Sequence, residues 1–265
     1  MLVHSNPLYL LLALVLLIIY IPILVKRWQI ILKIMGYKIQ YKECFHLILG
    51  ALPLTSVTPS KSGDVIKAYY LKGKVPISKT VGSVLTERIL DVSSLVLFSL
   101  IGMLFYQRFE LAGIALIILI GIIVIFFVSQ IDLHFPIRKS WNDKLRNVIL
   151  STKMLMKDKK AFSATMLCSL SIWFLSIVQT MIFFYAVGIK IPLLFTMANI
   201  PIAIFIGMMP VTVGGMGTRD AAIIFLFSEY AGPSELLGVG ILFSLFRYWL
   251  PSLVGIPFMR SKMLM

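Results

Sequence analysis

The chain has 265 residues, of which 59% are hydrophobic and 14% are charged, and its mean hydropathy is +0.96. This composition excludes a soluble domain and is typical of an integral membrane protein. The formal net charge of +14 would favour nucleic-acid binding in a soluble protein. Here most Lys and Arg residues lie between apolar segments, as the positive-inside rule and attraction to anionic lipids predict. A membrane is therefore the expected partner, and nucleic acid is not.

The first apolar run, residues 8–25, is followed by Lys26 and Arg27. A secretory signal peptide has the opposite order, with positive charge before its apolar core and small residues after it. We therefore predict a membrane-spanning helix whose N-terminus lies outside the cell.

The rest of the chain alternates between long apolar runs and two interrupted regions. A helix needs about 20 residues to cross the hydrocarbon core. Two regions, 41–71 and 192–230, each combine an apolar arm, a Pro/Gly-rich break and a shorter second arm, which is typical of re-entrant hairpins. The predicted fold class is an all-α polytopic membrane protein with two re-entrant or broken-helix hairpins and about five full spans, at residues 8–25, 81–106, 111–128, 162–187 and 235–258.

The basic loops predict the topology. Lys and Arg are frequent on both sides of the first hairpin and in the segment 138–160, for which an amphipathic surface helix is predicted. The loops around Glu110, Lys190 and residues 229–235 carry few positive charges, which suits the outside. The first hairpin then opens to the cytoplasm and the second to the exterior. The C-terminus is expected in the cytoplasm, and the protein in the plasma or inner membrane.

This order predicts an inverted repeat within a single domain of residues 1–265. The halves are about 8–106 and 162–258, linked by the span 111–128 and the basic loop 129–161. Pro53-Leu54-Thr55 matches Pro210-Val211-Thr212, and Arg88 follows the first motif at nearly the distance that Arg247 follows the second. Inverted repeats with broken helices are used by alternating-access transporters, which bind substrate near the bilayer midplane.

The break in the second hairpin, residues 208–220, contains a proline, three glycines and the pair Arg219-Asp220. Such a break at membrane depth is tolerated where the freed backbone groups face protein or a water-filled cavity. Thr218 can cap the following helix, and Ser60 or Ser62 can do the same in the first hairpin. The amides of these helix N-termini would then point into the membrane interior, where they suit a phosphate.

Charged residues inside spans form the second group of candidates, because each costs at least a few kcal/mol there. Glu87 and Asp91 lie one helical turn apart on one face, and Arg88 can meet Asp91 at i, i+3. Arg247 lies near the middle of the last predicted span. Two interpretations stay open together: a salt-bridge network, for example Arg247 with Glu87 or Asp91, and an anion-binding site.

The predicted substrate-binding residues combine both groups. Asp64 and Asp220 can cap a helix or restrain an arginine. The histidines and the two cysteines show no spacing typical of metal ligands, no nucleophile stands beside a histidine, and no P-loop is present. No cofactor, metal or catalytic residue is therefore expected, and the chain is not predicted to be an enzyme. The candidates are Arg88, Arg219, Arg247, Glu87, Asp91, Ser62, Gly63, Asp64, Gly215, Gly217, Thr218, Asp220 and Tyr248.

The sequence resembles the flippase-like membrane family that also forms the transmembrane region of lysylphosphatidylglycerol synthases. The resemblance runs nearly the whole chain, through the segments 26–36, 62–64, 86–91 and 214–220. It implies transfer of a lipid between leaflets. The chain departs from the family in three ways. One N-terminal span is expected to be missing. Lys61-Ser62 stand where the family is often richer in glycine, and Asp220 stands where the family often has Glu. It also lacks the aminoacyltransferase domain, so lipid aminoacylation is not expected.

Three functions are compatible with these observations. The first is a flippase for an anionic lipid, such as a polyprenyl-phosphate-linked sugar or an aminoacyl phospholipid. The second is a membrane-embedded lipid phosphatase or transferase, with Glu87 and Asp91 as a weak substitute for a catalytic pair. The third is a non-catalytic membrane partner of a glycosyltransferase or another lipid-modifying enzyme, in which the buried charges would pair only with one another.

Overall fold

The computed structural model describes residues 6–58, 62–107, 113, 116–117, 120–121, 153–209 and 211–263. Within these residues, four helical segments are long and apolar enough to cross a membrane: α1 (Pro7–Ile34), α4 (Ile77–Phe105), α7 (Lys159–Ala186) and the run Pro233–Met259. They confirm an all-α polytopic membrane protein and four of the five predicted spans. The fifth predicted span, residues 111–128, and most of the basic segment 129–161 lie outside the described residues.

The last span consists of three consecutive pieces. The α-helix α10 (Pro233–Ser244) continues into a π-helical turn, η3 (Leu245–Trp249), and then into α11 (Leu250–Met263). A π-helical turn widens the helix locally and is frequent at functional sites. This turn contains two of the predicted site residues, Arg247 and Tyr248.

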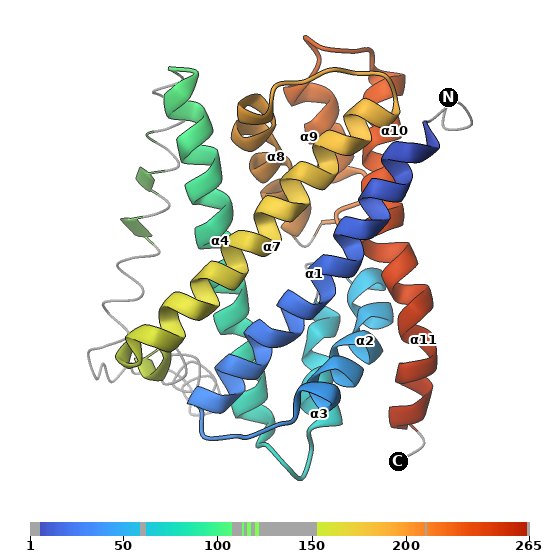
Figure 1. Cartoon of the computed structure of the whole chain (residues 1–265). Helices are drawn as coiled ribbons and strands as arrows, with labels where there is room; N and C mark the ends of the chain where they lie inside the picture. Colours follow the sequence, from blue (N-terminus) through green and yellow to red (C-terminus); the bar gives the residue numbers. More distant parts are fainter. Residues whose placement is uncertain are drawn as a thin grey trace.

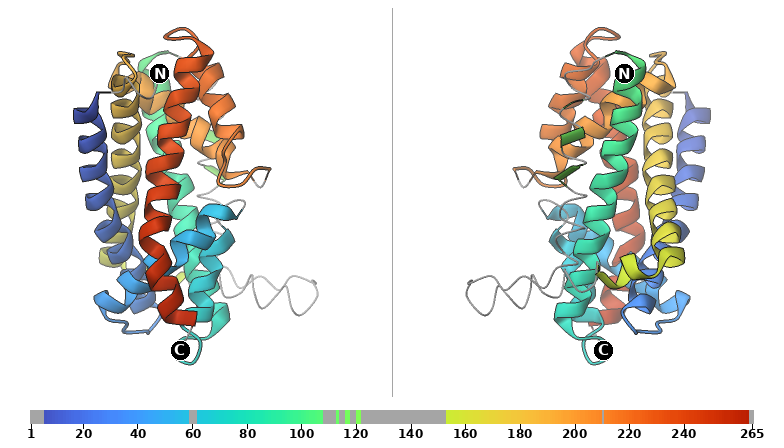
Figure 2. Two further views of the ribbon diagram at one scale, coloured as in Figure 1. Left: turned by 90° about the vertical axis from the view of Figure 1, so that its right-hand side faces the viewer. Right: turned by 90° about the vertical axis from the view of Figure 1, so that its left-hand side faces the viewer.

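Both interrupted regions are hairpins, and each enters and leaves at its own end of the bundle (Figure 1). The first consists of α2 (Tyr41–Val57), a 3₁₀ turn η2 (Ser62–Val65) and the short α3 (Ile66–Tyr70). The second consists of α8 (Leu193–Met208) and α9 (Thr218–Leu226). At 1.5 Å per residue α2 is about 26 Å long, less than the hydrocarbon thickness. The first hairpin lies in the half of the bundle that carries the C-terminus, and the second lies in the half that carries the N-terminus (Figures 1 and 2).

Glycine permits the sharp reversal in each hairpin. Gly215 has φ +72°, and a Cβ there would lie 2.5 Å from the carbonyl oxygen of Gly207 on α8. In the first hairpin, a Cβ on Gly63 would overlap the backbone of Leu54. A larger residue at either position would separate the returning segment from the helix that it follows.

Each hairpin packs against the helix that closes the other half of the chain. In the first hairpin, α2 lies along α11, where Ser252 Oγ donates to Ser56 Oγ at 2.6 Å. In the second hairpin, α8 lies along α4, where Ser99 Oγ donates to the carbonyl of Ala198 at 2.9 Å. The two halves are therefore interlocked, and the hairpins approach each other from opposite ends (Figure 2).

The two ends of the bundle differ in charge. The end that carries the C-terminus also carries the end of α1, the loops around the first hairpin and the start of α7 (Figure 1). We call it the basic end, because its exposed lysines include Lys33, Lys38, Lys42 and Lys72. The opposite end carries Glu229 and Glu235. The start of α1 and the end of α11 lie at opposite ends of the bundle (Figure 1). The orientation of the bundle, with the basic end in the cytoplasm, stays a prediction of the positive-inside rule.

The outer surface is apolar. Ile18 on α1 is 62% exposed and Leu253 on α11 is 62% exposed, and both belong to helices long enough to span a bilayer. Exposed apolar side chains on this scale are unfavourable in water and favourable in lipid. The aromatic core lies inside, where Phe184 stacks on Phe227 with ring centroids 4.7 Å apart.

Candidate functional site

A cluster of buried charged residues lies between α1, α4 and α7, on the side of the basic end. Arg27 of α1 is at its centre: Nη1 lies 2.6 Å from Asp91 Oδ1, and Nη2 lies 3.1 Å from Glu87 Oε1. Nη1 also donates to Ser169 Oγ on α7, and Trp173 Nε1 donates to Asp91 Oδ1 at 2.9 Å. These neutral donors satisfy carboxylate and guanidinium groups that the core withdraws from water.

Arg27 was missed as a site residue, because the first span was expected to end at Val25. The helix instead continues to Ile34, and Arg27 is only 1% exposed. The signal was present in the sequence: Trp28, Ile31 and Leu32 continue the apolar face beyond the two basic residues, and all three are buried. The suggested pairing of Arg247 with Glu87 or Asp91 is wrong, since Arg27 binds both carboxylates.

The cluster extends into the first hairpin through Asp64 and Lys67. Lys67 Nζ lies 3.3 Å from Glu87 Oε2 and 3.5 Å from Asp64 Oδ1. Arg88 Nη2 lies 2.9 Å from Asp64 Oδ2, and its Nη1 lies 3.3 Å from Asp91 Oδ2, as the i, i+3 spacing predicted. With Arg27 the cluster contains three basic and three acidic side chains, so its formal charges balance.

A small enclosed cavity lies beside this cluster, where the first hairpin meets α1 and the last span. Its water-accessible volume is about 40 Å³, room for about three water molecules and not for a lipid headgroup. Helix α4 contributes Arg88 to the wall of the cavity, and the π-helical turn η3 contributes Arg247 and Tyr248. Polar residues that line the cavity are Tyr20, Thr55, Ser56, Asp64, Lys67, Arg88, Arg247 and Tyr248.

Arg247 differs from the other basic residues of the cavity. Its guanidinium carbon lies 4.1 Å from the centroid of the Tyr20 ring on α1, a cation–π contact. Within the described part of the chain it makes no ion pair, whereas Arg88 and Lys67 both do. It lies 14 residues from the start of α10, or about 21 Å along the span at 1.5 Å per residue. A positive charge that has no carboxylate partner among the described residues therefore faces a cavity at membrane depth.

The second hairpin forms a separate polar centre. Arg219 Nη2 lies 2.6 Å from Asp220 Oδ1 and donates to Ser244 Oγ at 2.7 Å, and its guanidinium covers the Phe243 ring at 4.3 Å. Arg219 is 1% exposed and does not line the cavity of Arg88 and Arg247. The structure therefore does not bring the three predicted arginines together, although Tyr248 lies between the two centres, 5.8 Å from the Arg219 guanidinium.

The cap of α9 also differs from the prediction. Gly217, with φ +91°, occupies the N-cap position, and its amide donates to Asp220 Oδ2 at 3.0 Å. Asp220 thus both caps the helix and restrains Arg219, the two roles that the sequence left open. Thr218 is the first helical residue, and its Oγ1 lies 2.9 Å from Thr212 Oγ1. The prediction that Thr218 is the cap is wrong.

The described residues of the first hairpin include no equivalent cap. Ser62 begins the turn η2, whereas the N-cap of α3 is Val65, which makes no side-chain capping bond. Gly63 donates its amide to Thr58 Oγ1 at 2.7 Å. The prediction that Ser62 aims a helix N-terminus at a phosphate is therefore wrong, because α3 starts one turn later and contains only five residues. Ser60, the other candidate for this cap, lies outside the described residues.

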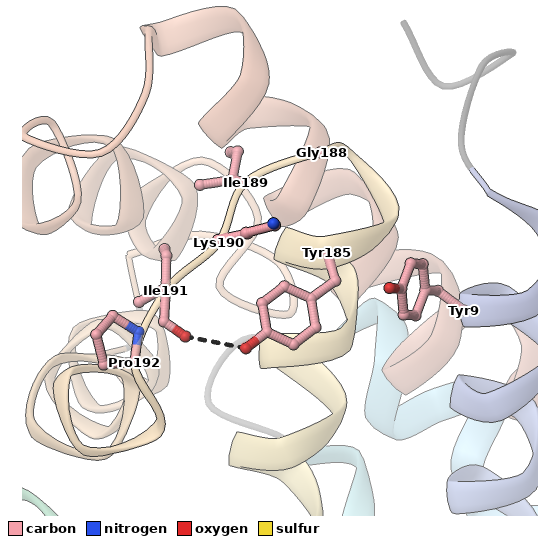
Figure 3. A pocket seen from close by; sticks show the side chains of 7 residues that line it. All are labelled: Tyr9, Tyr185, Gly188, Ile189, Lys190, Ile191 and Pro192. Carbon is pink, nitrogen blue, oxygen red and sulfur yellow. Dashed lines mark hydrogen bonds between the residues drawn. The ribbon is translucent and has the colours of Figure 1, made fainter.

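A larger open cleft of about 490 Å³ lies at the opposite end of the bundle (Figure 3). Tyr9 and Tyr185 form one wall with ring centroids 6.0 Å apart, and Tyr185 Oη donates to the carbonyl of Ile191 at 3.2 Å. Lys190 is the one charged residue among the described residues that line it. Tyrosines at this level are typical of a membrane–water interface. None of the predicted site residues lines this cleft.

Sequence comparison relates nearly the whole chain to a known membrane family. Residues 2–255 match the family model described as the lysylphosphatidylglycerol synthase TM region. The chain belongs to this family. It is also similar to a UPF0104 membrane protein of Methanocaldococcus jannaschii, with 27% identity covering 96% of this chain and 84% of the relative. UPF0104 membrane proteins of Methanothermobacter thermautotrophicus and Pyrococcus horikoshii share 25% and 23% identity, covering 97% and 93% of this chain and 87% and 85% of the relatives.

Membership of the lysylphosphatidylglycerol synthase TM family places the buried charges in a membrane protein related to lipid-modifying enzymes. The match covers both hairpins and both helices that carry the cavity arginines. The family match and the geometry together make the cavity between Arg88 and Arg247 the candidate functional site.

Proposed function

We propose that this protein moves an anionic lipid with a phosphate headgroup between the two leaflets of the membrane. The observation that carries the proposal is Arg247, a cation at membrane depth that lines a cavity and makes no ion pair within the described residues. An uncompensated charge in this position costs several kcal/mol unless a ligand or water offsets the cost. A phosphate bound between Arg247 and Arg88 would supply the missing negative charge.

Arg88 would act as the second contact to the headgroup. In the present conformation Asp64 occupies it at 2.9 Å, and Asp64 also accepts a hydrogen bond from Thr55 Oγ1 at 3.0 Å. A lipid phosphate can compete with this carboxylate, because both are anionic acceptors for the same guanidinium. The ion pair with Asp64 would hold Arg88 in place when no lipid is bound.

Transfer requires a conformational change, since the cavity is too small for a headgroup. The tips of the two hairpins meet beside it: a Cβ on Gly214 would lie 3.1 Å from the carbonyl oxygen of Ser56. Movement of one hairpin along its partner helix would open the cavity to one end of the bundle and keep the other closed. The acyl or prenyl chains would remain in lipid while the headgroup crosses.

The alternative functions make different demands on the same residues. A purely structural partner of another enzyme requires that buried charges pair with one another. Among the described residues, the cluster around Arg27 meets this requirement, and Arg247 does not. A phosphatase requires a nucleophile activated by a base, and the cavity-lining residues include hydroxyl groups but no histidine. A polyprenyl-phosphate-linked sugar and an aminoacyl phospholipid both satisfy the proposed site.

Purified protein in vesicles tests the proposal directly. A phosphatidylglycerol analogue with a fluorescent headgroup-proximal label is placed in both leaflets, and a membrane-impermeant reductant quenches the outer leaflet. Transport appears as additional loss of fluorescence. We expect Arg247→Ala to slow it at least about tenfold, because a charge-assisted hydrogen bond contributes about 1.5–3 kcal/mol. The matched control is Lys190→Ala, which removes one positive charge far from the cavity and should leave the rate unchanged.

Two outcomes would contradict the proposal. Equal transport by the wild type and Arg247→Ala would remove Arg247 from the site. Hydrolysis of the phosphate ester during the assay, detected by mass spectrometry of the extracted lipids, would favour the phosphatase.

A further inference from the structure

A second anionic site is indicated by a groove at the basic end, separate from the cavity between the hairpins. The groove lies between the last turn of α1 and the start of α7, and its volume is about 1020 Å³. These two helix ends lie close together at the same end of the bundle (Figure 1). None of the residues that line the cavity of Arg88 and Arg247 lines this groove.

Four lysines surround the groove. Lys33 comes from α1, Lys157 precedes α7, and Lys159 and Lys160 begin it. All four are exposed, and within the described part of the chain none of them makes an ion pair. The one acidic residue of the groove, Asp158, is engaged as the cap of α7, where Oδ1 accepts the amide of Ala161 at 3.0 Å. The described residues of the groove therefore carry a net positive charge, because the four lysines outnumber Asp158.

The positions of Lys159 and Lys160 are electrostatically unfavourable. They are the first two residues of the 28-residue helix α7, whose N-terminus carries a partial positive charge. Acidic residues usually occupy this turn, and here the first turn contains none. A bound anion would relieve the repulsion between the lysines and the helix dipole. It would also accept hydrogen bonds from the free backbone N–H groups of the first turn.

The floor of the groove is apolar. Ile30 and Ile34 of α1 and Ala164 of α7 line its inner part, next to the apolar outer surface of the bundle. A soluble anion would use only the lysines, whereas a phospholipid would use both parts, with its phosphate at the lysine rim and its acyl chain along the apolar floor. Basic pockets between membrane helices on the cytoplasmic side bind lipids of this class.

We infer that this groove binds the headgroup of an anionic phospholipid from the leaflet at the basic end. The bound lipid holds the ends of α1 and α7 together and is not the transported molecule. The site is independent of the proposed transport function, because it shares no lining residue with the transport cavity.

Lipid retention in nanodiscs tests the inference. The full-length chain is reconstituted in phosphatidylcholine containing a small fraction of phosphatidylglycerol, and the lipids that remain bound after release are counted by native mass spectrometry. The test variant is Lys33→Gln/Lys157→Gln/Lys159→Gln/Lys160→Gln. The matched control is Lys38→Gln/Lys42→Gln/Lys72→Gln/Lys79→Gln, which removes the same charge from positions at the same end that do not line the groove. Thermal unfolding of each protein in both lipid mixtures is the second measurement.

We expect the wild type and the control to retain phosphatidylglycerol, and the test variant to bind it at least about tenfold more weakly, because each lysine near a lipid surface contributes about 1 kcal/mol. Phosphatidylglycerol should raise the Tm of the wild type and the control and leave that of the test variant unchanged.

An equal loss of lipid binding in both variants would show diffuse attraction by net charge and overturn the site. Displacement of the lipid by an equal concentration of inorganic phosphate would overturn the assignment to a phospholipid. Unchanged transport by the test variant, measured in the vesicle assay, would support the independence of the two sites, and loss of transport with retained lipid would overturn it.

Discussion

Arg27 and Asp91 form a buried ion pair of 2.6 Å between α1 and α4, although 64 positions separate them in the chain. The pair connects the first span to the helix that also carries the cavity residue Arg88. Ser169 and Trp173 of α7 hydrogen-bond the same two side chains. A single arginine at the end of an apolar run thus holds three of the four long helices in register.

Substitution of Arg27 is expected to destabilise the bundle strongly. Arg27→Met leaves Glu87 and Asp91 buried with one fewer cation, and removal of one partner from a buried pair costs about 3–5 kcal/mol. The midpoint of thermal unfolding in detergent should fall markedly. Lys26→Met is the control, because Lys26 is the exposed neighbour of Arg27 and should leave the midpoint nearly unchanged. Equal stability of the two variants would contradict a structural role for Arg27.

The glycine turn of the second hairpin permits a matched comparison at two positions, 215 and 217. Gly215 and Gly217 both have positive φ, at +72° and +91°, so alanine is strained by about 1–2 kcal/mol at either. A Cβ at position 215 would also crowd the carbonyl of Gly207, whereas at position 217 no atom lies within 4 Å. Gly215→Ala should therefore lower the unfolding midpoint more than Gly217→Ala. The same shift in both variants would show that crowding against α8 does not limit the turn.

A disulfide between the first hairpin and α11 should stop transport. Ser56 Oγ and Ser252 Oγ lie 2.6 Å apart, and movement of the first hairpin along α11 must separate them. The double variant Ser56→Cys/Ser252→Cys is made in a background where Cys44 and Cys168 are replaced by alanine. Oxidation should abolish lipid transfer in the vesicle assay, and a reducing agent should restore it. Each single cysteine variant should be insensitive to oxidation. Full transport by the oxidised double variant would show that this hairpin does not move.

The orientation of the bundle can be measured at its two ends. Lys38 lies in a loop at the basic end and Ser234 lies near the start of α10, at the opposite end, and both are exposed. A single cysteine is placed at one position or the other in the cysteine-free background, and intact cells are treated with a membrane-impermeant maleimide. The positive-inside rule predicts labelling of Ser234→Cys and not of Lys38→Cys. The reverse pattern would place the basic end outside.

Much of the architecture follows from local sequence because the bilayer permits few structures. A backbone in hydrocarbon must satisfy its own hydrogen bonds, so long apolar runs become helices, and the glycine- and proline-rich breaks mark where helices reverse. The i, i+3 contact between Arg88 and Asp91 is also local, since helical geometry alone brings these side chains together. These features were predicted without knowledge of any contact between distant segments.

Only the tertiary structure decided which charges meet. Arg247 lies over the Tyr20 ring, and Glu87 pairs with Arg27 instead. Arg219 is buried against Asp220 and Ser244, away from the cavity. Helical periodicity places a side chain on a face but does not say which helix packs against that face. Burial of an ion is favourable only with a partner in the right geometry. The packing of α1 against α4 provides that geometry for the cluster around Arg27, and the π-helical turn before α11 places Arg247 at the cavity.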